Sequence, residues 1–463
     1  MRCASCGAVS ALGGESGGGF GEGAYDAAFY CVSCWRAWEG GGAAPQQNHF
    51  LYATGEEEAM LERFIGLVER GTWGEVGCTL ATRTSTQRQV PLARTAAGVP
   101  GGAEKWEALA SAARAVVETC EAAGILPHAA PFLRGAAGAA GSRLWQLITI
   151  YEMQVAEMLP RRQAPSSTAT PLGVSGCTGM GCGISGLIGQ TEEVDVSVYD
   201  YGALDIVARL RLTGASSAAL IYDPACTFCP IGLGVGGLAV ARFTLYPDRQ
   251  RDPGGTVQGG IPLAVVLWEL LLSERTLDEA VLWLQSLFAT SRHRPDAASP
   301  VMAAGASLLL GQPGRGVVLV EWSPEQIWVA PVAREGAVVH ANHCAFGSVL
   351  RDTAHHNVRE IIEESRRRQA AVEAFYAKEV LAARQVGPAD GLGLPRLKAA
   401  LALPGVQNDS VLATVLVCPA ARTVHVRFRL QTQGMERVED TLSCDFWQSF
   451  VDEECVNTPN ATP

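Results

Sequence analysis

The pattern of hydrophobic and polar positions changes near residue 176. On its N-terminal side, apolar residues recur at helical spacing, which predicts three amphipathic helices at 56–70, 104–123 and 142–158. The first of these would place Met60, Phe64, Ile65 and Val68 on one face. Residues 82–102 and the Pro-, Ser- and Thr-rich stretch 160–173 lack such spacing, and we interpret them as loops.

After residue 176 the chain consists mainly of short apolar runs that predict strands. These lie at 184–190, 194–200, 204–212, 218–222, 238–245, 306–310, 316–322, 326–332, 337–340, 411–418 and 423–430. A helix pair at 261–272 and 277–289, with a cap at Ser273 or Thr276, and a long helix at 357–384 separate the strand blocks. This order predicts an α+β fold with two stacked sheets flanked by helices.

Composition and charge narrow the function classes. Of the 463 residues, 48% are hydrophobic and 18% are charged, which is typical of a globular enzyme. The formal net charge of −11 argues against nucleic acid as a partner, because no basic field attracts phosphates. We interpret the cluster Arg366-Arg367-Arg368 as a solvated helix face. The longest apolar run, 261–272, is too short to span a membrane and contains a glutamate.

Four cysteines in the first 40 residues form two CxxC pairs, Cys3 with Cys6 and Cys31 with Cys34. Each pair can bring two sulfurs to about 2.3 Å from one zinc ion, so together they predict a structural Cys₄ zinc module. The alternative is a flexible cysteine-containing tail. Such a module could dock a protein partner. The start of the chain lacks the pattern of a secretory signal, so we expect a cytoplasmic location and reduced thiols.

A third CxxC, Cys226 with Cys229, has no second pair to complete a Cys₄ site, and we interpret it as a loop with two buried thiols. The glycines of 232–237 precede a strand and not a helix, so they do not indicate dinucleotide binding.

The segment around Cys177 carries the most informative chemistry. Cys177 follows Gly176 and leads into a predicted strand. A cysteine in this place is either a nucleophile or a small buried residue, and the local residues alone leave both interpretations open.

Several short motifs downstream occur in the order found in one family. They are Gly176-Cys177-Thr178, Gly189-Gln190-Thr191-Glu192-Glu193, Gly260-Ile261-Pro262, Leu277-Asp278-Glu279-Ala280, Val320-Glu321-Trp322-Ser323-Pro324, Val339-His340-Ala341-Asn342-His343-Cys344, and Ser365 with Arg368. Over about residues 145–430 the chain resembles the acyl-coenzyme A:isopenicillin-N acyltransferase family of cysteine N-terminal-nucleophile hydrolases. The cysteine pairs of residues 1–40 lie outside the resemblance.

The resemblance implies a four-layer αββα sandwich and self-cleavage between Gly176 and Cys177. The chain would then comprise the zinc module (1–40), a mainly helical pro-segment (41–176) and the hydrolase core (177–463). The new α-amine of Cys177 would act as base, Asn342 would donate its NH₂ to the oxyanion, and Glu193 or Asp195 would orient the amine. Glu193 replaces the family's aspartate, and Trp268 stands where the family has an arginine.

We therefore predict a self-processing amidohydrolase or acyltransferase that acts on a small amide or thioester and needs no cofactor for catalysis. Because a residue without Cβ tolerates strained backbone, Gly176 suits the cleaved bond. Two alternatives remain. One is a catalytically silent sandwich that interacts through the zinc module. The other is an uncut hydrolase that pairs Cys177 with His340 or His343.

Overall fold

The computed structural model describes residues 18–20, 29–31, 64–83, 102–141, 143–152, 155, 176–193, 205–213, 215, 217–223, 228–246, 260–291, 301–346, 356–386, 393–407, 411–428 and 447–451. These residues form a mixed α+β structure with two large sheets, which are antiparallel except at one strand pair. The α+β class with two sheets, predicted from the order of apolar runs, is thereby confirmed.

The larger sheet has eight strands. In spatial order they are β12 (Gln326–Val329), β11 (Gly316–Ser323), β10 (Ala306–Gln312), β9 (Ala239–Thr244), β8 (Ile231–Leu233), β7 (Ala219–Asp223), β6 (Asp205–Leu212) and β3 (Phe64–Gly71). Only the β3–β6 pair is parallel.

The smaller sheet has six strands and carries the segment around Cys177. Its order is β13 (Ala337–His340), β4 (Cys177–Cys182), β5 (Leu187–Glu193), β14 (Val411–Cys418), β15 (Thr423–Phe428) and β16 (Trp447–Val451). The strand that begins at Cys177 is therefore flanked on both sides, by β13 and by β5.

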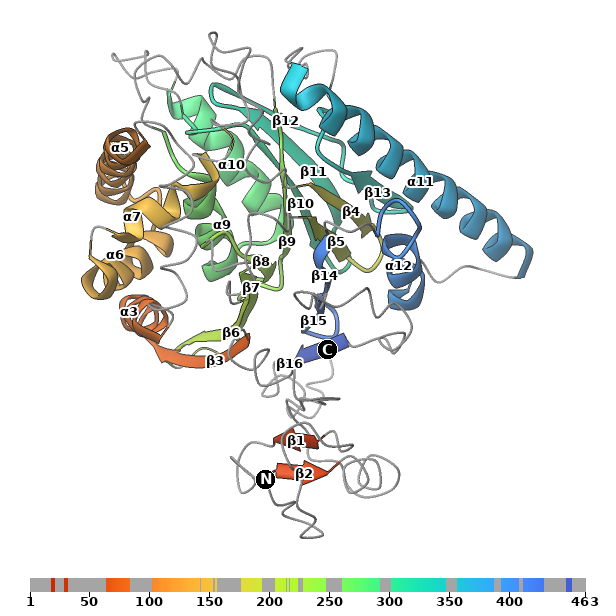
Figure 1. Cartoon of the computed structure of the whole chain (residues 1–463), viewed down its shortest axis with the longest axis horizontal. Coiled ribbons are helices and arrows are strands. Elements are labelled where there is room, and N and C mark those ends of the chain that lie inside the picture. The colour runs from red at the N-terminus through yellow and green to blue at the C-terminus, as the bar shows by residue number, and fades with distance from the viewer. Residues whose placement is uncertain are drawn as a thin grey trace, which may run out of the picture.

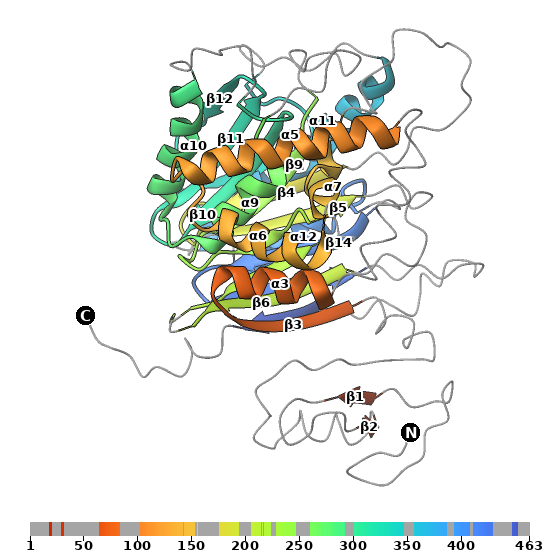
Figure 2. The ribbon, with the colours of Figure 1, turned by 90° about the vertical axis from the view of Figure 1, so that its left-hand side faces the viewer.

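Helices cover the outer face of each sheet (Figure 1). On the side of the larger sheet lie α3 (Trp73–Arg83), α5 (Gly102–Ala122), α6 (Ala129–Ala140), α7 (Arg143–Ile148), α9 (Leu263–Leu272) and α10 (Leu277–Ser291). Figure 2 shows the molecule from the side of these helices. On the side of the smaller sheet lie α11 (His356–Val386) and α12 (Leu394–Leu401).

Three buried apolar clusters join these layers. One packs the larger sheet on its helices and includes Leu308 of β10 and Trp268 of α9. A second lies between the two sheets and includes Cys177 itself. The third packs the smaller sheet on α11 and α12 and includes Met180 of β4 and Val372 of α11. Successive side chains of a strand point to opposite faces of its sheet, and here both faces are buried. The strands therefore appear in the sequence as nearly continuous apolar runs.

Most predicted elements are present. The strands predicted at 337–340 and 411–418 have those bounds, and the helices predicted at 104–123, 261–272, 277–289 and 357–384 correspond to α5, α9, α10 and α11. Thr276 is the cap of α10, because its hydroxyl and backbone N–H both donate to the Glu279 carboxylate, each at 2.8 Å.

The helix predicted at 56–70 is wrong over its described part, because Phe64–Gly71 is strand β3. Its eight residues pair in parallel with Asp205–Leu212 of β6. Aromatic and β-branched residues suit a strand, and a short apolar run does not distinguish helix from strand by spacing alone. The partner strand, far along the chain, decides the outcome.

Three helices were not predicted, and one predicted helix is interrupted. Helix α3 begins with a Thr72–Glu75 capping box, in which the Thr72 N–H donates to Glu75 Oε2 at 2.8 Å. Helices α6 and α12 were likewise not predicted. The helix expected at 142–158 is present as α7 and, after a turn at Thr149, as helical residues at 150–152 and 155. Helix α6 is rich in Ala and Gly, so its apolar spacing is weak.

Some predictions fall on parts of the chain outside the described residues, among them the strand at 194–200 and the loop at 160–173. Near the N-terminus, β1 (Gly18–Phe20) and β2 (Phe29–Cys31) pair antiparallel. The division at 40 and 176 stays a prediction. No helix in the described ranges has the length and apolar character needed to cross a membrane.

Candidate active site

Cys177 is the first residue of β4 and has no solvent-exposed surface. Gly176 continues the ladder with β5: its N–H donates to the Glu193 carbonyl at 3.1 Å, and its carbonyl accepts from the Glu193 N–H at 2.7 Å. Cys177 lies opposite Glu192 in the same register. The Gly176-Cys177 bond is therefore held in regular sheet geometry at the end of two paired strands.

The Cys177 thiol contacts a buried group of charged and polar side chains. Its Sγ lies 3.5 Å from Glu192 Oε2. The Glu192 carboxylate also accepts from Gln190 Nε2 at 2.9 Å and from Arg242 Nη2 at 2.8 Å. Arg242 belongs to β9, so this group bridges the two sheets. The guanidinium balances the carboxylate charge in the interior.

Burial dominates the electrostatics of this group. It raises the pKa of the Cys177 thiol well above its usual value, and the Glu192 charge raises it further. Burial also raises the pKa of the Glu192 carboxyl, which Arg242 partly offsets. In the intact chain the thiol is therefore protonated at neutral pH, and attack requires a group that accepts its proton.

Asn342 meets the backbone of Cys177. It follows β13, which pairs with β4, and its Oδ1 accepts a hydrogen bond from the Cys177 N–H at 2.6 Å. The same oxygen accepts from Arg368 Nη2 at 3.0 Å, while Nδ2 donates to the Thr244 carbonyl at 3.1 Å. In the intact chain the carbonyl side of the amide, and not the NH₂ expected to bind an oxyanion, faces Cys177.

Two buried side chains hold the loop that contains Asn342. Ser365 Oγ, from α11, accepts from the Asn342 N–H at 2.6 Å. Glu321, from β11, accepts from the backbone N–H groups of Ala345 at 2.9 Å and Phe346 at 3.2 Å. Asn342 is therefore positioned from two different layers of the fold.

Arg368 is not part of a solvated helix face, and that prediction is wrong for this residue. Its side chain is 4% exposed, whereas Arg366 and Arg367 are exposed. It forms an ion pair with Glu193 as well as the bond to Asn342. Burial lowers the pKa of Arg368 to about 10, so the guanidinium stays charged at neutral pH. Helical spacing places Ser365 and Arg368 on the same face of α11.

Gly176 does not have a positive φ, so a left-handed backbone conformation does not explain the glycine. Space explains the glycine instead. A Cβ built on Gly176 would overlap Glu193 Oε2 and lie 2.8 Å from Arg368 Nη1. The buried ion pair thus occupies the volume that any side chain at 176 would need.

The two histidines near Asn342 contact other groups. His343 Nδ1 lies 2.8 Å from Ser365 Oγ, and His340 Nε2 lies 3.5 Å from Glu321 Oε1. Burial lowers the pKa of His340 to about 3, so this ring is neutral and its contact with Glu321 is not an ion pair at neutral pH.

The side chains of the remaining predicted site residues fall outside the described part of the chain. Asp195 is outside the described residues, as are the side chains of Cys3, Cys6, Cys31 and Cys34, so the zinc module stays a prediction. Within the described ranges, no group of three or more His, Cys, Asp or Glu side chains is arranged to hold a metal. Cys229 is buried, as the interpretation of its CxxC expected, and Cys226 is not described.

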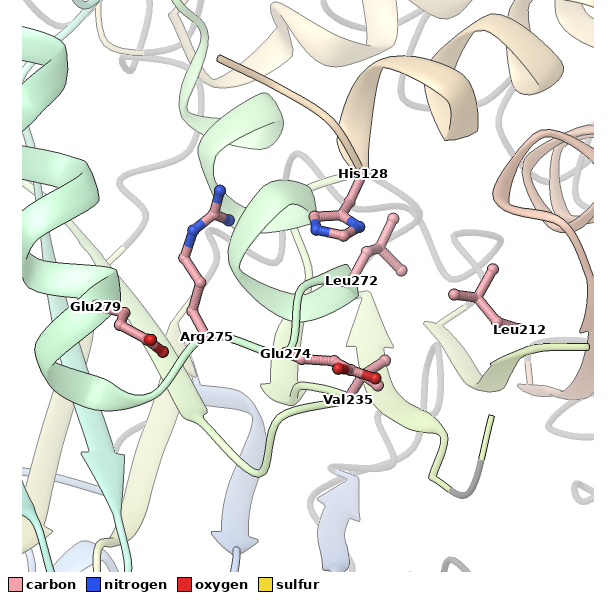
Figure 3. A pocket seen from close by; sticks show the side chains of 7 residues that line it. All are labelled: His128, Leu212, Val235, Leu272, Glu274, Arg275 and Glu279. Atoms are coloured by element: carbon pink, nitrogen blue, oxygen red, sulfur yellow. The ribbon is translucent and has the colours of Figure 1, made fainter. Parts of the chain in front are cut away.

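A separate surface hollow of about 490 Å³ lies between α6, β6 and the α9–α10 turn, with His128, Arg275 and Glu279 among its lining residues (Figure 3). Beside it, the buried Glu269 carboxylate pairs with Arg275 at 2.7 Å and accepts from the Ala129 N–H at 2.8 Å. The N-terminus of α6 is thus already occupied by an internal carboxylate. None of the lining residues belongs to the group around Cys177.

Two residues of the site, Glu192 and Arg242, were not predicted from the sequence. Glu192 was visible beside Glu193 in the motif of residues 189–193, but adjacent strand residues point to opposite faces, and only the register selects between them. Arg242 lies in an apolar strand pattern that carries no catalytic signal.

The chain matches no protein-family model, and no curated protein matches its sequence. Function is therefore inferred from the residues around Cys177.

Proposed function

We propose that this protein is a self-processing cysteine N-terminal-nucleophile hydrolase or acyltransferase of the four-layer αββα class. The observation that carries the proposal is the 2.6 Å hydrogen bond between the Cys177 N–H and Asn342 Oδ1, at the start of a strand of the smaller sheet whose Cys177 side chain lies between the two sheets. Cleavage between Gly176 and Cys177 would turn that nitrogen into an α-amine. Asn342 and its partner Arg368 would then hold the amine beside the thiol.

The chemistry follows from the two groups on one residue. An α-amine has a reference pKa of about 7.7–8.0, so near neutrality it can accept the thiol proton. The thiolate then attacks the acyl carbon of an amide or thioester and forms an acyl-enzyme. Water or an amine completes hydrolysis or transfer. After cleavage the Asn342 amide would turn so that its NH₂ faces the oxyanion, as the family resemblance implies.

A second observation supports an oxyanion site at the backbone. The Gly176 carbonyl oxygen accepts from the Glu193 N–H at 2.7 Å, within the range for a stabilising donor. A substrate carbonyl bound where Gly176 now lies would meet the same donor. Backbone donors are suited to this role because they need no reorganisation during the reaction.

Intact mass spectrometry of the full recombinant chain tests the proposal. The wild type is expected as two chains, 1–176 and 177–463, while Cys177→Ala remains a single chain. Cys182→Ala is the matched control, because Cys182 is also buried in β4 but belongs to the cluster facing α11 and α12. This variant is expected to be cut normally.

Labelling with a thiol-reactive acyl probe separates the alternatives. Cut chain labelled at Cys177 supports the proposal. Wild-type chain that stays whole and unlabelled overturns it in favour of an interaction protein. Whole chain labelled at Cys177, with labelling lost in His340→Ala or His343→Ala, overturns it in favour of an uncut cysteine–histidine hydrolase.

A further inference from the structure

The first turnover of a self-processing enzyme raises a separate chemical problem. Before cleavage the Cys177 nitrogen is an amide and cannot act as a base, so the thiol proton must pass to another group. Burial keeps that thiol protonated in the intact chain. The self-cleavage step therefore requires a base that is already present in the uncut fold.

We infer that the Glu192 carboxylate is the general base for self-cleavage, with Arg242 and Gln190 holding it against the Cys177 thiol. This inference rests on the proposed function. Glu192 Oε2 lies 3.5 Å from Sγ, and its two oxygens are oriented by Arg242 Nη2 at 2.8 Å and Gln190 Nε2 at 2.9 Å. Glu193, by contrast, pairs with Arg368.

The step balances without any further reagent except water. The Cys177 sulfur attacks the Gly176 carbonyl carbon while its proton passes to Glu192, and the Glu193 N–H stabilises the resulting oxyanion. The carbon–nitrogen bond then breaks, and the nitrogen takes the proton back from Glu192. This leaves a Gly176 thioester on Cys177 and a free α-amine. Water hydrolyses the thioester, which releases the Gly176 carboxylic acid and the thiol.

Burial makes Glu192 more suitable for this role than a surface carboxylate. A general base is most effective when its pKa approaches the working pH, and desolvation raises the pKa of Glu192 in that direction. Arg242 keeps the carboxylate ionised enough to accept a proton, because it offers a compensating charge inside the protein.

The rate of cleavage in Glu192→Gln tests the inference. Glutamine keeps an oxygen for Arg242 but is not basic, so we expect cleavage roughly 100-fold slower or more, within the range for losing a general base. Hydroxylamine, which attacks thioesters, is expected not to restore cleavage, because the thioester itself does not form. Glu269→Gln is the matched control: it also neutralises a buried carboxylate paired with an arginine, and it should leave the cleavage rate unchanged.

Folding of each variant is measured by circular dichroism and thermal unfolding. If Glu192→Gln does not fold, Glu192→Asp is measured in its place. Aspartate keeps the charge opposite Arg242 but withdraws the carboxylate from the thiol by one methylene, so slower cleavage is expected. Cleavage of a folded variant at the wild-type rate overturns the inference, although a cut wild type would still support the proposed function. Accumulation of a hydroxylamine-sensitive thioester in Glu192→Gln also overturns it, because Glu192 would then act in hydrolysis. A wild type that is never cut refutes the proposed function itself.

Discussion

Gly176→Ala tests how closely the site is packed around the bond to be cleaved. The added Cβ would lie 2.8 Å from Arg368 Nη1 and would overlap Glu193 Oε2. Both side chains are buried, at 4% and 5% exposure, so the ion pair cannot move into solvent. Overpacking of this kind costs about 1–3 kcal/mol, whereas replacing glycine where the backbone permits gains about 0.4–1 kcal/mol. The steric cost is the larger effect, and we expect a net destabilisation of about 1–2 kcal/mol.

Urea unfolding in a Cys177→Ala background measures this loss in chains that all remain whole. Gly138→Ala is the control, because Gly138 lies in α6 and a Cβ added there would have no neighbouring atom within 4 Å. It should stabilise the chain by roughly 0.8–1.0 kcal/mol, the helix-propensity difference between alanine and glycine. A Gly176→Ala chain as stable as its parent would refute the packing explanation.

Two further predictions concern groups behind the site, again in the Cys177→Ala background for stability. Ser365→Ala leaves the buried Asn342 N–H without its acceptor, so the free energy of unfolding in urea should fall by about 1–3 kcal/mol. With Cys177 present, the same substitution should slow cleavage. If neither the stability nor the cleavage rate changes, the assigned contact is contradicted. Burial raises the pKa of the Glu152 carboxyl from 4.5 to about 7. The stability that this protonated group contributes is therefore fully present below pH 4.5 and is lost as the pH rises through about 7. Glu152→Gln keeps an acceptor for the Leu263 N–H but cannot ionise. The difference in unfolding free energy between this variant and its parent should therefore grow in favour of the variant across that pH range, toward a value on the order of 3 kcal/mol at 1.36 kcal/mol per pKa unit. A stability difference that does not change with pH would contradict the raised pKa of Glu152.

Local patterns predicted much of the fold after residue 176. The strands at 337–340 and 411–418 and the cap at Thr276 could be read directly, because apolar runs, turn residues and capping pairs act over a few residues. The motif order also singled out Cys177, Asn342 and Glu193 as candidate catalytic residues, and it included Ser365 and Arg368 without a role. The structure joins them in one buried network, in which Asn342 bonds to the Cys177 N–H, to Ser365 and to Arg368, and Arg368 pairs with Glu193.

Other features depended on partners distant in sequence. Strand β3 exists through its pairing with β6, which no local spacing at 56–70 reveals. Arg368 looked like one of three solvated arginines, but the packing of α11 on the smaller sheet turns it toward Glu193 and Asn342. Arg242 reaches the thiol group from the opposite sheet. Each outcome is a long-range contact.

The sequence by itself determined most of the strands and helices after residue 176 and the residue types available for chemistry, because these depend on neighbours along the chain. Which of two adjacent glutamates meets the sulfur was decided only by tertiary structure. Successive residues of a strand point to opposite faces, so Glu192 and Glu193 are equivalent candidates until the register is known. The pairing of Cys177 with Glu192 across β4 and β5 makes that choice.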